Sequence, residues 1–180
     1  AASSQGLIAP TPVQSQAIPA ILNGHDLRAC APTGSGKTAA YVLPLLQQWL
    51  LSDAAQRQGS RSTQALVLVP TRELAAQVAE LIYHVGEAMG RRPKVAVLTG
   101  GVSINPQLMA LRGGADMVIA TPGRLLDVVA HSQLKLHTID TLVMDEADRL
   151  LDLGFAEELE QVLALLPAKT ARQTLLLSAT

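Results

Sequence analysis

The chain has 180 residues, of which 48% are hydrophobic and 16% charged, and its formal net charge is −1. This length suits one domain with its own core, and the charge argues against broad, charge-driven binding of nucleic acid. It leaves open a narrow groove in which local charge clusters read a phosphate backbone. No apolar stretch approaches the roughly 20 residues that span a bilayer, so we expect no membrane contact. The single cysteine, Cys30, excludes an internal disulfide and favours a reducing, cytoplasmic location, with Cys30 as a small core residue.

Short aliphatic runs alternate with helical stretches along the whole chain. Runs of this kind are typical of parallel strands buried on both faces, and they cover residues 27–31, 65–69, 95–98, 117–120, 142–144 and 175–177. The helical stretches that separate them cover residues 37–51, 72–88, 105–111, 123–129 and 155–166. This alternation predicts an α/β fold, with a largely parallel sheet flanked by helices on both faces.

A polar or glycine-bearing cluster follows each predicted strand. In open sheets of this kind, ligands bind outside the carboxyl ends of the strands. We therefore expect these clusters to meet at one edge of the sheet and to form the active site there.

The first cluster is a glycine-rich segment that runs from Ala31 to Thr38 and opens a helix. Such a loop can turn its backbone N–H groups around phosphate oxygens, at the positive end of the following helix. The residues that we expect to hold a nucleotide here are Thr33, Gly34, Ser35, Gly36, Lys37 and Thr38. Lys37 would reach the β and γ phosphates, and the Thr38 hydroxyl would hold Mg²⁺. On this segment alone, a glycine-rich turn with an incidental lysine remains the alternative.

An acidic pair, Asp145 and Glu146, follows the fifth predicted strand. Asp145 would bind Mg²⁺, directly or through water, because hard cations prefer carboxylate oxygens. Glu146 would orient and deprotonate the attacking water beside the γ phosphate. The alternative is an ordinary acidic helix start capped by Asp145 or Asp148.

The segment Asp145-Glu-Ala-Asp148 resembles the signature of the DEAD-box ATP-dependent RNA helicases. The segments beginning at Pro10, Pro70, Thr99, Thr121 and Ser178 are similar to that family's other motifs, in the family's order. Ala31 at the start of the glycine loop is also usual in the family. The resemblance covers about Gly6 to Thr180, and it implies the N-terminal, ATP-binding RecA-like domain of such a helicase.

The glycine-rich segment from Ala31 to Thr38 is called the phosphate loop below. The resemblance also implies roles for residues outside this loop. Gln14 would read the adenine of ATP through one donor and one acceptor, although a polar residue on a short surface helix is the alternative. The family's aromatic residue upstream of this glutamine is missing, since no aromatic precedes Tyr41. Asp148, Ser178 and Thr180 would couple the metal site to the second domain, with a hydrogen bond between Asp148 and Ser178.

A second set of residues is implied to contact the RNA sugar–phosphate backbone, without reading the base sequence. These residues are Pro70, Thr71, Arg72, Gly100, Gly101, Thr121, Pro122, Gly123 and Arg124. For Arg72 and Arg124, a solvated charge or a salt bridge is the alternative.

We expect residues 1–180 to form the first domain of a monomeric enzyme whose second RecA-like domain, with the family's arginine finger, lies beyond Thr180. The isolated domain would then bind nucleotide but hydrolyse it poorly. Two other functions remain open: a helicase or translocase that acts on DNA, and an ATP-gated RNA clamp without turnover. Asp148 and Gln14 count against the DNA alternative, and the intact Lys37 and Glu146 count against the clamp.

Overall fold

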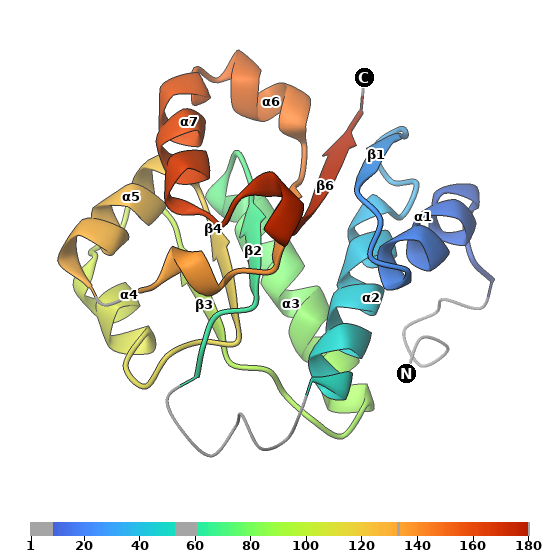
Figure 1. Ribbon diagram of the computed structural model, residues 1–180, viewed down its shortest axis with the longest axis horizontal. Helices are drawn as coiled ribbons and strands as arrows, with labels where there is room; N and C mark the ends of the chain where they lie inside the picture. The colour runs from blue at the N-terminus through green and yellow to red at the C-terminus, as the bar shows by residue number, and fades with distance from the viewer. Residues whose placement is uncertain (1–8, 53–60, 133, 180) are drawn as a thin grey trace.

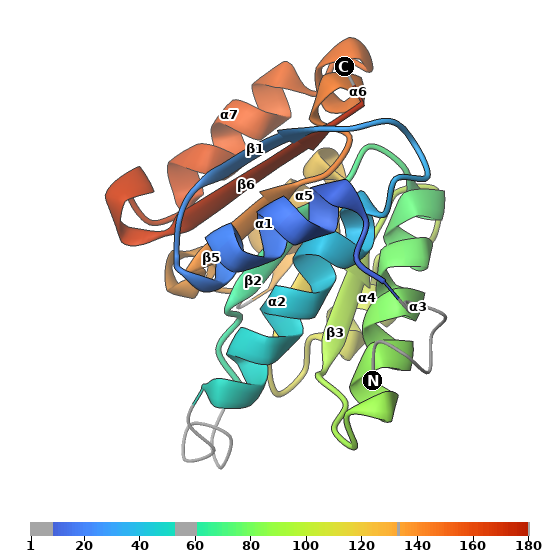
Figure 2. The same ribbon diagram turned by 90° about the vertical axis from the view of Figure 1, so that its right-hand side faces the viewer.

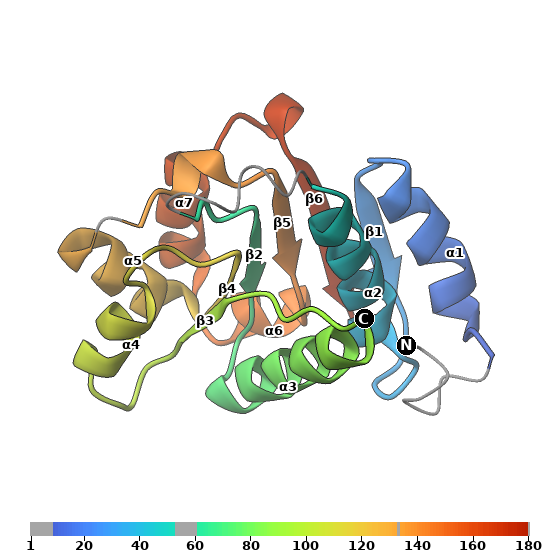
Figure 3. The same ribbon diagram turned by 90° about the horizontal axis from the view of Figure 1, so that it is seen from below.

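The computed structural model describes residues 9–52, 61–132 and 134–179. Its centre is one six-stranded sheet in the order β1-β6-β5-β2-β4-β3. Every neighbouring pair of strands is parallel, and the arrows of β1, β5 and β6 point the same way in Figure 3. The predicted parallel sheet is confirmed.

The elements follow the predicted alternation closely. The strands are β1 (Leu27–Cys30), β2 (Ala65–Leu68), β3 (Val95–Leu98), β4 (Met117–Ala120), β5 (Thr141–Met144) and β6 (Gln173–Ser178). The α-helices are α1 (Pro12–Leu22), α2 (Lys37–Leu51), α3 (Arg72–Ala88), α4 (Asn105–Ala110), α5 (Pro122–His131), α6 (Ala147–Asp152) and α7 (Ala156–Leu165). Two short 3₁₀ helices, η3 (Leu136–Thr138) and η4 (Lys169–Ala171), precede β5 and β6.

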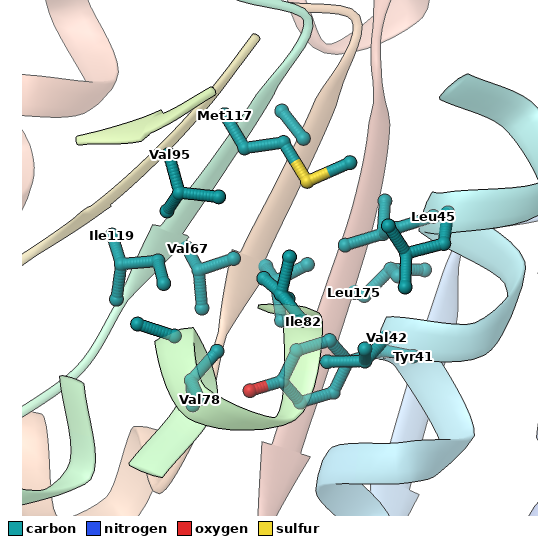
Figure 4. Packing of buried hydrophobic residues seen from close by; sticks show 14 of the residues in the cluster. Tyr41, Val42, Leu45, Val67, Val78, Ile82, Val95, Met117, Ile119 and Leu175 are labelled. Atoms are coloured by element: carbon teal, nitrogen blue, oxygen red, sulfur yellow. The ribbon is translucent and has the colours of Figure 1, made fainter. Parts of the chain in front are cut away.

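The sheet separates two hydrophobic cores, as the alternation of side chains along β2 shows. Ala65 and Val67 join a cluster with α1, α2 and α3, whereas Leu66 and Leu68 join a cluster with α5, α6 and α7. Figures 1 and 2 show the two helical layers on either side of the strands, and Figure 4 shows part of the first cluster. Because both faces are covered, the central strands need the continuous aliphatic sequence that predicted them.

The carboxyl ends of the strands form one edge, which lies toward the top of Figure 1. The phosphate loop follows β1 and the acidic pair follows β5, with β6 between these two strands. The Ala31 N–H donates to the Ser178 carbonyl at 3.1 Å, which ties the start of the loop to the end of β6. The predicted nucleotide residues therefore share this edge.

Two expectations about local structure were wrong or incomplete. Cys30 is exposed, because β1 is an edge strand on which the better-covered side chains alternate with exposed ones. Helix α1 was expected only as the short surface helix of the alternative for Gln14, and Pro19 inside it is unfavourable in a helix interior. A capping box between Thr11 and Gln14 starts α1 and offsets part of that disadvantage.

Candidate nucleotide site and nucleic-acid face

The phosphate loop has a backbone that only glycine adopts easily at two positions. Gly34 and Gly36 have φ angles of 80° and 90°, in the left-handed region where a Cβ is unfavourable. Gly36 is also the N-cap of α2 and supplies no side-chain cap, so the first N–H groups of that helix lack the usual side-chain partner. The Ser35 hydroxyl is shielded from solvent and has no hydrogen-bond partner within the described part of the chain. An anion seated in this loop would supply the missing acceptors.

Gln14 packs directly against this loop. Its side-chain Oε1 accepts from the Thr11 N–H at 3.1 Å, and its Nε2 donates to the Gly36 carbonyl at 3.2 Å. A Cβ at Gly36 would collide with the same Nε2. Gln14 is 3% exposed, so it is no ordinary surface residue of α1. Its amide still has one donor and one acceptor beyond these two bonds.

Lys37 lies back over the loop. Its Nζ donates to the carbonyl oxygens of Ala31 and Pro32, the latter at 3.1 Å. The side chain is largely buried. The ammonium group is therefore held at the first two residues of the loop.

Asp145 lies at the end of β5, buried against the helix that follows the phosphate loop. Its Oδ2 accepts from the Tyr41 hydroxyl at 2.9 Å, and its Oδ1 accepts from the Glu146 N–H at 2.9 Å. It is 2% exposed, and burial raises the pKa of its carboxyl group, while these two bonds and the nearby Lys37 charge oppose that rise. Asp145 is thus not the N-cap of the following helix, a position that Glu146 occupies, and it lies near enough to Lys37 to feel its charge.

Sequence reasoning missed Tyr41. Its ring is completely buried, and burial together with the Asp145 charge raises the pKa of its hydroxyl well above the ordinary value. The available signal was its position, four residues after Lys37, because residues four apart share one face of a helix. That signal is weak, since an aromatic residue at such a position usually belongs to the core.

Glu146 has an unusual backbone conformation. Its φ of 50° is the one positive value among the non-glycine residues that the structure describes. The residue turns the chain from β5 into α6, for which it is the N-cap. Its Oε2 pairs with Arg149 Nη1 at 2.8 Å. Strained residues of this kind cluster at active sites.

Asp148 links α6 to the end of β6. Its Oδ2 accepts a hydrogen bond from the Ala179 N–H at 3.1 Å, which brings α6 to the residue after Ser178. The Ser178 carbonyl in turn accepts from Ala31. The structure thus connects the acidic motif, the last strand and the phosphate loop, whereas Thr180 lies outside the described residues.

The residues expected to contact RNA lie together on the neighbouring part of the same edge. They border an open hollow of about 380 Å³, whose lining includes Thr71, Arg72, Gly100, Thr121, Gly123 and Arg124. Gly101, with a φ of 78°, lies beside this hollow, and a Cβ there would be 3.6 Å from Arg72 Nη1. Pro70 and Pro122 are buried behind this surface, so their rings form its support.

The two arginines of this face differ sharply. The Arg72 side chain is 61% exposed and pairs with Glu73 at 2.7 Å. The Arg124 side chain is 13% exposed, and both of its terminal nitrogens donate to the Val102 carbonyl at 3.0 Å. Arg124 also pairs with Asp127 at 3.6 Å. The salt-bridge alternative therefore describes both residues in this state, and Arg124 holds the loop that follows Gly101.

A larger hollow lies elsewhere on the molecule. It measures about 710 Å³ and is bordered by residues that include Arg61, Arg112 and Lys135, beyond the C-terminal ends of α4 and α5. It contains none of the predicted site residues. The larger hollow therefore does not coincide with the candidate site, which stands out by its glycine conformations and buried polar contacts.

None of the described helices is both long and apolar enough to cross a membrane.

Comparison with known proteins agrees with this geometry. The family model for the DEAD/DEAH box helicase matches residues 11–180. The chain is 48% identical over 175 residues to the ATP-dependent RNA helicase DbpA of Escherichia coli. This match covers 97% of this chain and 36% of the relative. It is 45% identical to the DEAD-box ATP-dependent RNA helicase CshA of Streptococcus pneumoniae, over 97% of this chain and 31% of the relative.

Solved structures show the same relationship. The yeast DEAD-box splicing factor Prp28 matches with a TM-score of 0.89 and 33% identity, over 99% of this chain and 43% of that chain. A hypothetical ATP-dependent RNA helicase from Sulfolobus tokodaii matches with a TM-score of 0.82 and 37% identity, over 99% of this chain and 48% of that chain. The chain thus spans about a third of the relatives' length and under half of the solved chains. The expected RecA-like fold is confirmed, and the chain belongs to the DEAD/DEAH box helicase family.

Proposed function

We propose that this chain is the N-terminal, ATP-binding RecA-like domain of an ATP-dependent RNA helicase. One observation carries the proposal: the Asp145 carboxylate is fixed against α2 through the Tyr41 hydroxyl, one turn beyond the phosphate-loop lysine. A phosphate cradle and a buried carboxylate at one sheet edge suit a nucleotide with its cation. The relatives named above are RNA helicases, which favours RNA over DNA as the nucleic acid.

The phosphate loop would hold the triphosphate of ATP. The N–H groups at the start of α2 and the Ser35 hydroxyl would donate to phosphate oxygens. Lys37 would leave the carbonyls of Ala31 and Pro32 and neutralise the β and γ phosphates. Gln14 would offer its remaining donor and acceptor to the adenine edge.

Thr38 and Asp145 would hold Mg²⁺ between them. Within the described residues, no cluster of three histidine, cysteine or acidic side chains forms a metal cage. This fits Mg²⁺, which proteins hold through one or two carboxylates together with substrate phosphates and water. When bound, the ion neutralises charge on the β and γ phosphates.

Glu146 would act as the general base in hydrolysis. A water oxygen attacks the γ phosphorus, the bond to the bridging oxygen of ADP breaks, and Glu146 accepts a proton from the water. The ion pair with Arg149 holds the Glu146 side chain beside the site before ATP binds.

RNA would bind along the neighbouring hollow through its sugar–phosphate backbone. Arg72, the N–H groups at the starts of α3 and α5, and the exposed Gly100–Gly101 turn are suitable partners for phosphates. None of these groups reads base edges, so binding would not depend on sequence. Arg124 would act mainly by holding the Val102 carbonyl.

A second RecA-like domain of the same protein would complete the enzyme. The contacts from Asp148 to Ala179 and from Ala31 to Ser178 would transmit the state of the nucleotide to that domain. We expect an arginine finger in the second domain to contribute about 10³–10⁵ in rate. The present chain alone would therefore bind nucleotide but turn it over slowly and would not unwind RNA.

The test compares this chain with the full-length protein. Binding of a fluorescent ADP analogue is measured for both, and phosphate release is measured with and without RNA. We expect both proteins to bind the analogue and only the full-length protein to show RNA-stimulated release. Full RNA-stimulated release by the chain alone, or failure of both proteins to bind the analogue, would contradict the proposal.

A further inference from the structure

The Tyr41 hydroxyl joins the helix of the phosphate loop to the acidic motif at a place from which solvent is excluded. Tyr41 is completely buried and Asp145 is 2% exposed. The 2.9 Å bond between them joins residues 104 positions apart in the sequence. A buried carboxylate needs its donors, so loss of this bond would leave one oxygen of Asp145 without a partner that the structure supplies.

This bond fixes the orientation of the Asp145 carboxylate. Oδ1 is held by the Glu146 N–H and Oδ2 by Tyr41. With one bond at each oxygen, the plane of the group is set, while each oxygen keeps a second lone pair for another partner. The first of these bonds is local in sequence, whereas the second alone relates the carboxylate to α2.

Thr38 lies on the same helix as Tyr41, three residues before it, so the two side chains are neighbours on one face of α2. The bond from Tyr41 to Asp145 therefore relates Asp145 to the helix that carries Thr38. Thr38 and Asp145 are the two side chains assigned to Mg²⁺ above. A group that orients metal ligands from behind is a common feature of metal sites, and its loss lowers metal affinity by about 10–100-fold.

We propose that Tyr41 is a positioning residue for the Mg²⁺ site, whose hydroxyl fixes Asp145 relative to Thr38 so that both can reach one cation. The inference rests on the proposed function, because it takes Thr38 and Asp145 as the residues that hold the ion. Tyr41 touches neither nucleotide nor water in this role. It acts only through Asp145, to which its hydroxyl donates.

The ring of Tyr41 has a separate, structural role. It packs in the cluster between the sheet and α1–α3, together with Val42, Val78 and Ile82, and Figure 4 shows its oxygen at the end of the ring. Phenylalanine would keep this packing and remove only the hydroxyl. Tyr41→Phe therefore separates the two roles.

Tyr83 provides the matched control. Its hydroxyl donates to the Val95 carbonyl at 3.2 Å, on α3 and away from the phosphate loop. Tyr83→Phe removes one tyrosine hydroxyl and one hydrogen bond without touching Thr38 or Asp145. Thermal melting of both variants gives the purely structural effect of each change.

The experiment measures affinity for a fluorescent ADP analogue with and without Mg²⁺, using this chain. The quantity of interest is the factor by which Mg²⁺ tightens binding. We expect Tyr41→Phe to lower this factor about tenfold and to leave Mg²⁺-free affinity nearly unchanged. Tyr83→Phe should leave both unchanged.

A double-mutant cycle with Asp145→Asn tests the route of action. If Tyr41 acts through Asp145, then Tyr41→Phe adds no further loss of Mg²⁺ tightening in the Asp145→Asn background. Full additivity of the two losses would overturn the inference, as would a Tyr41→Phe factor within twofold of the wild type. If the wild-type protein itself shows no Mg²⁺ tightening, the assignment of Thr38 and Asp145 fails instead.

Discussion

The nucleotide part of the sheet edge and the nucleic-acid part differ in how their polar groups are held. Gln14, Lys37 and Asp145 are at most 8% exposed, and each is tied to another element or to the loop. In the other part, Arg124 is also covered, at 13% exposure, whereas Arg72 is 61% exposed and bonded only to its neighbour Glu73 among the contacts described. Buried, tied groups suit a small ligand of fixed shape, whereas exposed groups suit a flexible polymer held at many weak points.

The largest effect should come from the chemical step. Glu146→Gln in the full-length protein removes the proton acceptor and keeps the shape of the side chain. We expect RNA-stimulated phosphate release to fall by about 10²–10⁴-fold, while the affinity for a fluorescent ADP analogue stays close to that of the wild type.

Glu87→Gln is the control, because it also neutralises a glutamate paired with an arginine, Arg92. It should keep full activity. Unchanged phosphate release in Glu146→Gln would show that Glu146 is not the base. Release that is negligible already in the wild type would favour the RNA clamp.

Lys37→Ala tests the buried part at the step of binding. Loss of a charged donor to phosphates removes about 1.5–3 kcal/mol, so we expect nucleotide affinity to fall by about 10–100-fold. Lys94→Ala is the control, because Lys94 Nζ bonds to the Arg112 carbonyl on the surface. Equal losses in the two variants, measured by fluorescence titration, would contradict a specific role for Lys37.

Arg72→Ala tests the exposed part. If Arg72 contacts one phosphate, RNA affinity should fall several-fold for all sequences alike, and the slope of log K against log salt should decrease by about 1. Arg92→Ala is matched to it, since Arg92 is 60% exposed and also pairs with a nearby glutamate. An unchanged salt slope in Arg72→Ala would remove this residue from the interface.

Arg124→Ala should have the smallest effect of these substitutions, and it compares the two arginines of the nucleic-acid part. Because its guanidinium holds the Val102 carbonyl, we expect a loss of about 1 kcal/mol in the free energy of unfolding. Arg72→Ala should change it by less than about 0.5 kcal/mol. Equal unfolding midpoints in urea would show that Arg124 does not support this loop.

The sequence predicted those parts of the molecule that depend on local pattern. The six strands follow from aliphatic runs, and α2 and α3 occupy the predicted residues because their hydrophobic stripes are long. Cys30 was placed wrongly because its exposure depends on β1 lying at the edge, and strand order is a property of the whole chain. Helix α1 was expected only as a short surface helix around Gln14, because its buried face consists of Gln14, Ala17 and Ile21 and gives a short stripe.

The candidate site shows the same division. The phosphate loop and acidic pair are contiguous motifs, so their residues could be named in advance. The partners that fix them could not, because Tyr41 and Asp145, Gln14 and Gly36, or Arg124 and Val102 meet only after the chain has folded. Motifs thus name the candidate groups, and tertiary contacts determine how those groups are oriented.

The left-handed backbone at Glu146 lowers the stability of the fold at the residue proposed as the general base. Such a conformation in a residue other than glycine disfavours the folded state by about 1–2 kcal/mol, and it occurs at the side chain on which proton transfer would depend. A glycine or asparagine there would relieve the conformational penalty but remove the carboxylate. If Glu146 is the base, substitutions that raise the thermal stability of this protein without loss of activity would lie at other positions, in keeping with the trade-off between stability and activity in enzymes.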